Sequence, residues 1–232
     1  LFLGGLFGAG IATGYALNLF NKVSVPEKDA LIRQVQNISA VSKLTYSDSS
    51  VISSIDSDLI RVTVDSSAIS ENVKKAVIAT EDENFMTHNG VVPKAVLRAT
   101  LGSVVGIGSA SGGSTITQQI IKQQVVGDAP TFTRKATEII DALALERYMT
   151  KDEILTTYLN VSPFGRNNKG QNIAGVEEAA QGIFGVSASQ LTIPQAAFIA
   201  GLPQSPIVYS PYASNGSLKT PENMAYGLNR AK

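Results

Sequence analysis

An uncharged apolar segment at the start of the chain restricts the fold more than any other feature. Residues 1–20 read LFLGGLFGAGIATGYALNLF, in which Asn18 is the only strongly polar side chain. A helix rises about 1.5 Å per residue, so a helix of this length matches a hydrocarbon core of roughly 30 Å. A signal peptide usually has a shorter apolar core that ends at small residues, whereas this segment continues into Asn21, Lys22 and Val23. The segment therefore favours a retained transmembrane anchor over a cleaved signal or a buried helix.

Composition excludes several classes of protein. At 232 residues the chain is long enough to bury a substantial core. Its 19 basic and 19 acidic residues balance, so it lacks the overall positive charge of a typical nucleic-acid-binding protein. The absence of cysteine and the single histidine, His88, exclude disulfides and zinc sites built from thiolates or several histidines. Any site for a polyanion must therefore be local.

Changes in polarity and periodicity divide the rest of the chain. Residues 21–44 are polar and predict a stalk, with a short helical patch at Leu31, Val35 and Ile38. Between residues 43 and 64, alternating stretches separated by Ser and Asp clusters predict a small β-hairpin. The later spacing is mostly helical, so we expect a mainly α fold. Capping residues predict helix starts at Ser70, Ser114, Thr133, Thr150 and Thr192.

An anion site is predicted where glycines lead into a helix. Gly112 and Gly113 precede Ser114, and the free amides and positive dipole end of a helix start favour a negative ligand. Ser114, Gln118 and Lys122 are spaced by four and would form one polar stripe, although an ordinary capped helix with a solvated face explains them equally well. No GK[ST] sequence follows the glycines, so a nucleotide P-loop is excluded.

Charged residues further along extend this prediction. Arg134 and Lys135 could join Lys122 around a diphosphate, because a guanidinium binds phosphate oxygens bidentately and an ammonium adds a point charge. An exposed surface pair between Arg134 and Glu138 is the alternative. Glu81 stands where a helix ends, and a carboxylate there could remove a proton from an attacking hydroxyl. A solvated acid at a helix end is the simpler explanation for Glu81 taken alone.

Four linked blocks resemble the signature motifs of family 51 peptidoglycan glycosyltransferases. In order, they are EDENFMTHNG (81–90), GGSTITQQ (112–119), RKATE (134–138) and KDEILTTYLN (151–160), and the run AGLPQSPIVYSP (200–211) is similar too. The family occurs in class A penicillin-binding proteins and in monofunctional enzymes. The resemblance implies a lysozyme-like helical head at residues 45–232, with a small membrane-proximal jaw at about 91–113. Lys94, Arg98, Val104 and Val105 of this jaw would meet the bilayer.

The resemblance also assigns roles to residues. Glu81 would be the general base and Glu138 a second acidic residue near the leaving diphosphate. The diphosphate and sugars would contact Ser114, Gln118, Lys122, Arg134 and Lys135. Supporting roles would fall to Asp82, Phe85, His88, Thr115, Gln119 and Asn160.

The implied reaction polymerises lipid II into β-1,4-linked strands with inversion and releases undecaprenyl diphosphate. Mg²⁺ or Mn²⁺ would be held mainly by that diphosphate, with no metal site from protein side chains. The expected partners are lipid II, the growing glycan strand, the bilayer, moenomycin-type inhibitors and other cell-wall synthesis proteins, and no nucleic acid. The catalytic domain would lie on the extracytoplasmic face of the cell membrane and would be held there by a single-pass anchor.

Two departures from the family pattern leave questions open. Pro130 stands where many relatives carry a basic residue, and Arg230 is the only arginine in a block that is usually rich in arginine. No lysine follows a serine by three positions, so we expect no transpeptidase site in this sequence. The alternative functions are a lysozyme-like muramidase or lytic transglycosylase, and a non-catalytic membrane-anchored cell-wall-binding module.

Overall fold

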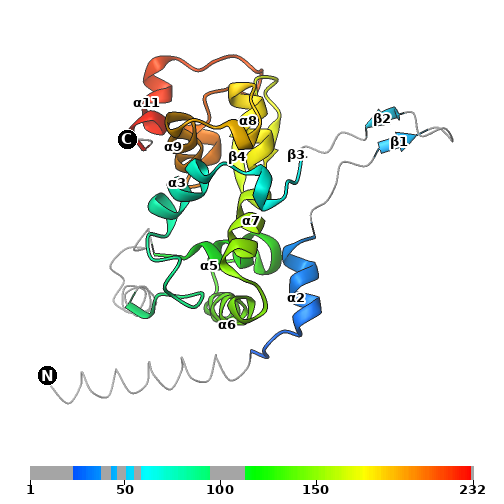
Figure 1. The fold of residues 1–232 in the computed structure, drawn as a ribbon, viewed down its shortest axis with the longest axis vertical. Coiled ribbons are helices and arrows are strands. Elements are labelled where there is room, and N and C mark those ends of the chain that lie inside the picture. Colours follow the sequence, from blue (N-terminus) through cyan, green and yellow to red (C-terminus); the bar gives the residue numbers. More distant parts are fainter. Residues whose placement is uncertain (1–22, 38–42, 46–50, 55–58, 95–112, 231–232) are drawn as a thin grey trace, which may run out of the picture. The chain divides into compact units, whose positions relative to one another are not determined.

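The computed structural model describes residues 23–37, 43–45, 51–54, 59–94 and 113–230 (Figure 1). The predicted anchor at residues 1–20 and most of the predicted jaw at 91–113 lie outside these ranges. No helix within them combines the length and the apolar character needed to cross a bilayer. The chain divides into two compact units, the first made of residues 1–35 and 88–150 and the second of residues 36–87 and 151–232. The described part is mainly helical, as predicted.

Helices make up the described part of the first unit. They are α2 (Lys28–Val35), α5 (Ile116–Ile121), the π-helix η2 (Lys122–Val126) and α6 (Phe132–Tyr148). α6 packs against each of the other three. Leu31, Ile120 and Leu145 are buried in this core, and burial of each such side chain stabilises the fold by about 1.5–3 kcal/mol. The helix predicted around Leu31 and Val35 is confirmed, and it belongs to the core of this unit.

The caps of α5 and α6 differ from the prediction. Thr115 caps α5: its hydroxyl accepts a hydrogen bond from the Gln118 amide, and the Gln118 side chain accepts one from the Thr115 amide. This reciprocal capping box places Ser114 before the helix. α6 begins at Phe132 and is capped by Thr131. The starts predicted at Ser114 and Thr133 are therefore wrong, because a nearby threonine satisfies the first free amides in each case.

Two small sheets belong to the second unit. β1 (Lys43–Thr45) and β2 (Val51–Ser54) form an antiparallel hairpin, as predicted. β3 (Leu59–Arg61) lies outside that hairpin and pairs in parallel with β5 (Asn172–Ala174). β5 also pairs with β4 (Pro163–Arg166), antiparallel, which gives the order β3-β5-β4. The sequence did not predict β4 and β5, because strands of three or four residues carry too little periodicity.

Helices cover this three-stranded sheet and extend the second unit. α8 packs on all three strands and α10 on β4, while α11 packs on α9 and α10. The predicted start at Thr192 is confirmed, since Thr192 and Gln195 form a capping box. The helices are η1 (Ser66–Ala68), α3 (Glu71–Glu81), α7 (Lys151–Val161), α8 (Val176–Phe184), η3 (Ala188–Gln190), α9 (Ile193–Gly201), α10 (Pro206–Tyr209) and α11 (Pro221–Arg230).

α3 carries the chain to the predicted base. Ser70 caps this helix, because its hydroxyl accepts a hydrogen bond from the Asn72 amide at 3.1 Å. Val73 and Val77 are fully buried and one turn apart, and α3 packs closely against α9. Glu81 is the last residue of α3, so a helix whose buried face packs against α9 holds it in place.

Candidate active site

Glu81 forms an ion pair within the second unit. Its Oε1 accepts a hydrogen bond from Arg230 Nη2 at 2.7 Å. Only 9% of the Glu81 side chain and 25% of the Arg230 side chain are exposed, so water screens this pair less than it screens a surface pair. Arg230 ends α11, which packs on α9, and α9 packs on α3. The packing of three helices thus joins two residues that are 149 positions apart.

Tyr158 lies close to this pair. It is fully buried on α7, and burial together with the Glu81 carboxylate raises the pKa of its hydroxyl above the ordinary range of tyrosine. The hydroxyl therefore keeps its proton throughout the physiological pH range. Neutral Tyr158 adds no second negative charge beside Glu81.

Asp82 and Phe85 shape the turn that follows Glu81. The Asp82 amide donates to the Ile78 carbonyl, and the Asp82 carbonyl accepts from the Phe85 amide at 2.9 Å. The Phe85 ring is fully buried, and Lys151 Nζ lies 4.4 Å from its centroid in a cation–π contact. These two predicted supporting residues fix the backbone next to Glu81.

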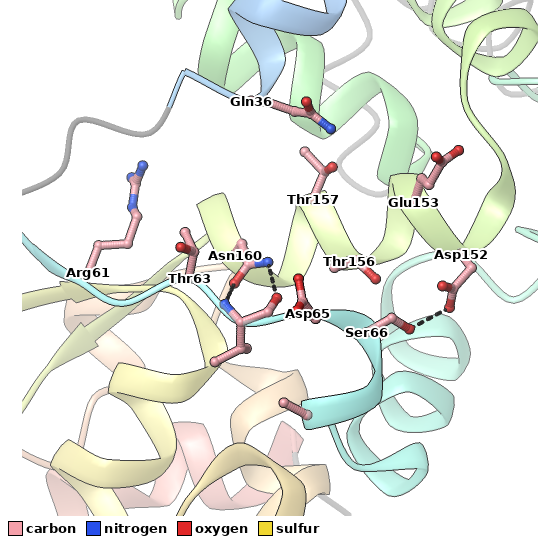
Figure 2. A pocket seen from close by; sticks show the side chains of 12 residues that line it. Gln36, Arg61, Thr63, Asp65, Ser66, Asp152, Glu153, Thr156, Thr157 and Asn160 are labelled. Atoms are coloured by element: carbon pink, nitrogen blue, oxygen red, sulfur yellow. Dashed lines mark hydrogen bonds between the residues drawn. The ribbon is translucent and has the colours of Figure 1, made fainter.

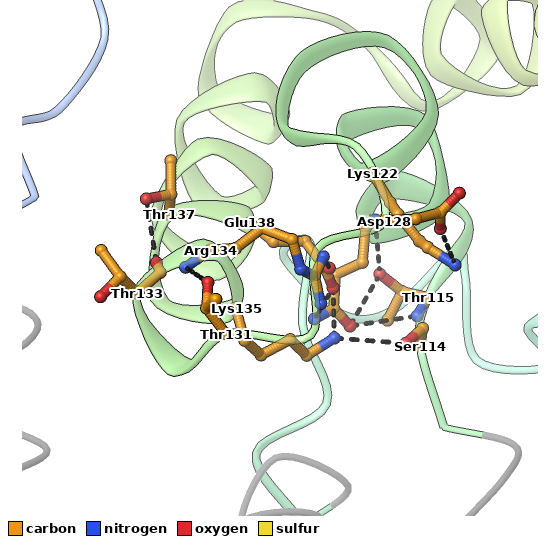
Figure 3. A network of polar contacts seen from close by, with 11 residues as sticks. Ser114, Thr115, Lys122, Asp128, Thr131, Thr133, Arg134, Lys135, Thr137 and Glu138 are labelled. Atoms are coloured by element: carbon orange, nitrogen blue, oxygen red, sulfur yellow. Dashed lines mark hydrogen bonds and ion pairs between the residues drawn. The ribbon is translucent and has the colours of Figure 1, made fainter.

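Glu138 lies at the centre of a polar cluster in the first unit (Figure 3). Its side chain is 2% exposed and accepts hydrogen bonds from Arg134 Nη1 at 2.5 Å, from Gln118 Nε2 at 3.2 Å and from Lys135 Nζ. Lys135 Nζ also donates to Ser114 Oγ at 3.3 Å. Arg134 Nε is buried and has no hydrogen-bond partner among the described residues. Two cations therefore share one carboxylate, which leaves net positive charge and an unused donor.

The predicted polar stripe on α5 is wrong. Ser114 precedes the helix and is exposed, whereas Gln118 is 2% exposed because it faces Glu138. Lys122 is exposed and pairs with Asp128, with Nζ and Oδ1 2.7 Å apart. Gln119 is half-buried. Ser114 and Gln118 still reach one cluster, since the packing of α5 on α6 brings both to the residues around Glu138.

His88 and Thr115 hold the backbone that leads to this cluster. The Gly90 amide donates to His88 Nδ1 at 3.1 Å, and Thr115 Oγ1 donates to the Gly90 carbonyl at 2.6 Å. Gly90 has φ of +90°, and a Cβ there would lie 2.5 Å from the Ala142 carbonyl oxygen. Only glycine fits this conformation at this distance from α6. The hydrogen bonds of Gly90 to His88 and Thr115 fix the position of the α5 cap, and the cap in turn fixes the position of Gln118.

Asn160 has the contacts of a structural residue (Figure 2). Its Nδ2 donates to the Val64 carbonyl at 2.8 Å and its Oδ1 accepts from the Val64 amide at 3.0 Å, so it ties the chain after β3 to α7. Asn160 also lines an open cavity of about 800 Å³ in the second unit, together with Arg61, Asp65 and Asp152. Glu81 does not line this cavity.

Sequence reasoning missed three charged or polar contacts. It left the role of Arg230 open, and it did not single out Tyr158 or Asp128. Tyr158 is one of the quoted YLN residues, but nothing local marks it as a neighbour of Glu81. Asp128 follows Gly127, a turn signal that could have suggested a chain reversal toward Lys122.

The described carboxylates do not form a metal site. The described ranges contain no group of three or more His, Cys, Asp or Glu side chains placed to hold an ion. Glu81 and Glu138 are each engaged by cationic side chains, which compete with a metal for the same oxygens. This donor set does not fit a divalent ion held by the described side chains.

Comparisons with known proteins agree with these motifs. The model of the transglycosylase family matches residues 48–230. Penicillin-binding protein 1A of Clostridium perfringens (strain 13 / Type A) is 34% identical over 222 residues, covering 94% of this chain and 31% of the relative. Penicillin-binding protein 1A/1B of Bacillus subtilis (strain 168) is 38% identical over 161 residues, covering 69% of this chain and 17% of the relative.

A third relative extends the same pattern. Penicillin-binding protein 2a of Streptococcus pneumoniae (strain ATCC BAA-255 / R6) is 41% identical over 146 residues, covering 63% of this chain and 19% of the relative. The chain thus spans less than a third of the length of these curated relatives. The family match spans well over half of the chain and includes Glu81, Glu138 and Arg230. The chain belongs to the transglycosylase family, as a peptidoglycan glycosyltransferase domain of the class A penicillin-binding protein type.

Proposed function

We propose that this domain polymerises lipid II into β-1,4-linked glycan strands, with inversion at the anomeric carbon and release of undecaprenyl diphosphate. Glu81 takes the proton from the attacking 4-hydroxyl of the acceptor sugar. The cluster around Glu138 binds the diphosphate and supports its departure. Sugar transfer requires both functions: a positioned base, and compensation of the negative charge on the leaving group.

The Glu138 cluster is the observation that carries this proposal. Arg134 and Lys135 both contact a carboxylate that is almost fully buried, and buried Arg134 Nε still lacks a partner among the described residues. Glu138 holds both cations in place, while one negative charge cannot neutralise two positive ones. A dianionic phosphate group would supply the missing charge and an acceptor for the free donor. A cleaving enzyme that acts on the same sugars has no diphosphate to bind.

The environment of Glu81 suits a base. Because Arg230 donates to Oε1, the carboxylate is held in one orientation at the end of α3. A base held in this way needs less reorganisation when the acceptor hydroxyl arrives, and a positioned base typically contributes about 10²- to 10⁴-fold in rate.

Several finer features belong to the same proposal. The helical head is lysozyme-like, residues 91–113 form a jaw at the bilayer, and residues 1–20 span the cell membrane once with the catalytic domain outside. Moenomycin-type inhibitors bind the diphosphate site, and other cell-wall synthesis proteins act with the domain. Mg²⁺ or Mn²⁺, when present, accompanies the substrate diphosphate and neutralises part of its charge.

Labelled lipid II tests the proposal directly. The wild-type chain should lengthen glycan strands, and Glu81→Gln should lower the rate by at least about 10²-fold while lipid II binding persists. Glu83→Gln is a matched control, because Glu83 is an exposed acid two residues away. Shortened strands would instead identify a lytic enzyme, and unchanged lipid II a binding module. Normal turnover by a folded Glu81→Gln variant would refute the assignment of the base.

A further inference from the structure

Asp128 forms an ion pair with Lys122, one of the cations that the family resemblance assigns to the diphosphate. Lys122 Nζ and Asp128 Oδ1 are 2.7 Å apart, and Figure 3 shows this pair together with the Glu138 cluster. The Asp128 side chain is 87% exposed and that of Lys122 is 48% exposed. The pair therefore lies at the surface of the first unit, where a ligand from solvent can reach it.

The backbone between the two residues brings them together. η2 spans Lys122–Val126 as a π-helix, and the Gly127 amide donates to the Lys122 carbonyl at 2.9 Å. Gly127 has φ of +70° and ψ of −161°, a combination that is essentially restricted to glycine. This residue reverses the chain so that Asp128 returns to the side chain of Lys122. A Cβ at Gly127 would meet no atom within 4 Å, so conformation alone requires glycine here.

Electrostatics support the same assignment. The hydrogen bond and the charge of Lys122 lower the pKa of Asp128, and the charge of Arg134 lowers it further. Asp128 therefore stays ionised at neutral pH. Its carboxylate interacts electrostatically with Lys122 and Arg134, two of the cations predicted to bind the diphosphate. In the described cluster, three cations face two carboxylates, Glu138 and Asp128.

We propose that Asp128 is an internal competitor for the phosphate site, which a diphosphate ligand must displace from Lys122. This inference rests on the proposed function, because that function supplies the diphosphate. Glu138 is buried and held by three donors, so it remains in the cluster when a ligand binds. Asp128 is exposed and held by one ion pair, and exposed ion pairs are weak, so Asp128 can leave. Asp128 thereby lowers the affinity of the site for phosphate groups.

Binding of inorganic pyrophosphate to the full chain in detergent tests the inference by titration calorimetry at low salt. Asp128→Asn should tighten binding about two- to five-fold, the range that an exposed ion pair supports. Gly127→Ala should act in the same direction, because it disfavours the reversal that returns Asp128 to Lys122. Asp29→Asn is the matched control, since Asp29 is an exposed aspartate on α2 in the same unit. It should leave the affinity unchanged.

A double-mutant cycle with Lys122→Ala separates the outcomes. Lys122→Ala alone should weaken pyrophosphate binding, and Asp128→Asn should then have no further effect. Equal or weaker binding by the Asp128→Asn variant would overturn the inference, as would the same tightening in Asp29→Asn. If Lys122→Ala weakens binding while Asp128→Asn changes nothing, only the competitor role fails. If Lys122→Ala leaves binding unchanged, the competitor role and the diphosphate assignment of Lys122 both fail, while the role of Glu81 still stands on the polymerisation assay.

Discussion

Asp141 should make the stability of the domain depend on pH in a predictable direction. It lies on α6, is 4% exposed, and burial raises its pKa from 3.8 to about 6. The folded state therefore holds the proton more tightly than the unfolded state, so stability is highest at low pH and falls as the pH rises through about 4 to 6. Above that window the full difference of about two pKa units between the folded and unfolded states applies, and it lowers the unfolding free energy by about 3 kcal/mol. At pH 4.5 the same two pKa values lower the unfolding free energy by only about 1 kcal/mol.

Asp141→Asn removes the titrating group and nearly keeps its shape. We expect the variant to exceed the wild type in unfolding free energy by about 3 kcal/mol at pH 7.5 and by about 1 kcal/mol at pH 4.5. Urea denaturation followed by circular dichroism in one detergent measures both values. Asp29→Asn, at an exposed aspartate of the same unit, should show no such pH-dependent gain. A gain of equal size at both pH values, or a loss of stability at pH 7.5, would refute the reasoning.

Substitutions at three further positions test other contacts. Glu138→Gln removes the charge that holds two cations, so urea denaturation should show an unfolding free energy lower by about 1.5–3 kcal/mol, and lipid II polymerisation should fall. Arg230→Met should slow polymerisation with little change in apparent KM, because the contact with Arg230 orients Glu81. Arg230→Lys should recover part of the rate, and equal rates in the Arg230→Met variant and the wild type would exclude a positioning role for Arg230. Gly90→Ala should cost about 1–3 kcal/mol, because φ of +90° and the nearby Ala142 carbonyl both oppose a Cβ. An unchanged Tm would contradict that account.

Contacts within one or two helical turns could be predicted from the sequence. Ser70 and Thr192 cap helices as expected, because a cap requires only the right oxygen at the right backbone position. Arg134 and Glu138 pair as their spacing of four predicts, since one helical turn places them on one face. The signature blocks also identified the family, because their order and spacing are properties of the chain itself.

Exposure and long-range pairing depended on the tertiary structure. Gln118 belongs to a pattern that reads as a solvated stripe, yet it is buried because α6 covers the face that presents it to Glu138. β3 reads as part of a local hairpin, yet it pairs with a strand more than 100 residues away. Neighbouring residues do not encode which face another element will cover, so local periodicity cannot decide these cases.

The Glu81–Arg230 and Lys122–Asp128 ion pairs show the same division between local sequence and tertiary structure. The sequence by itself determined that Glu81 ends a helix, since this statement rests on local spacing. The tertiary structure decided that Arg230 engages Glu81, through the packing of α3, α9 and α11. The backbone of η2 and Gly127 decided that Asp128 engages Lys122, because a π-helix and a positive φ reverse the chain there. An ion pair depends on where two charges lie in space, and only the folded backbone sets that distance.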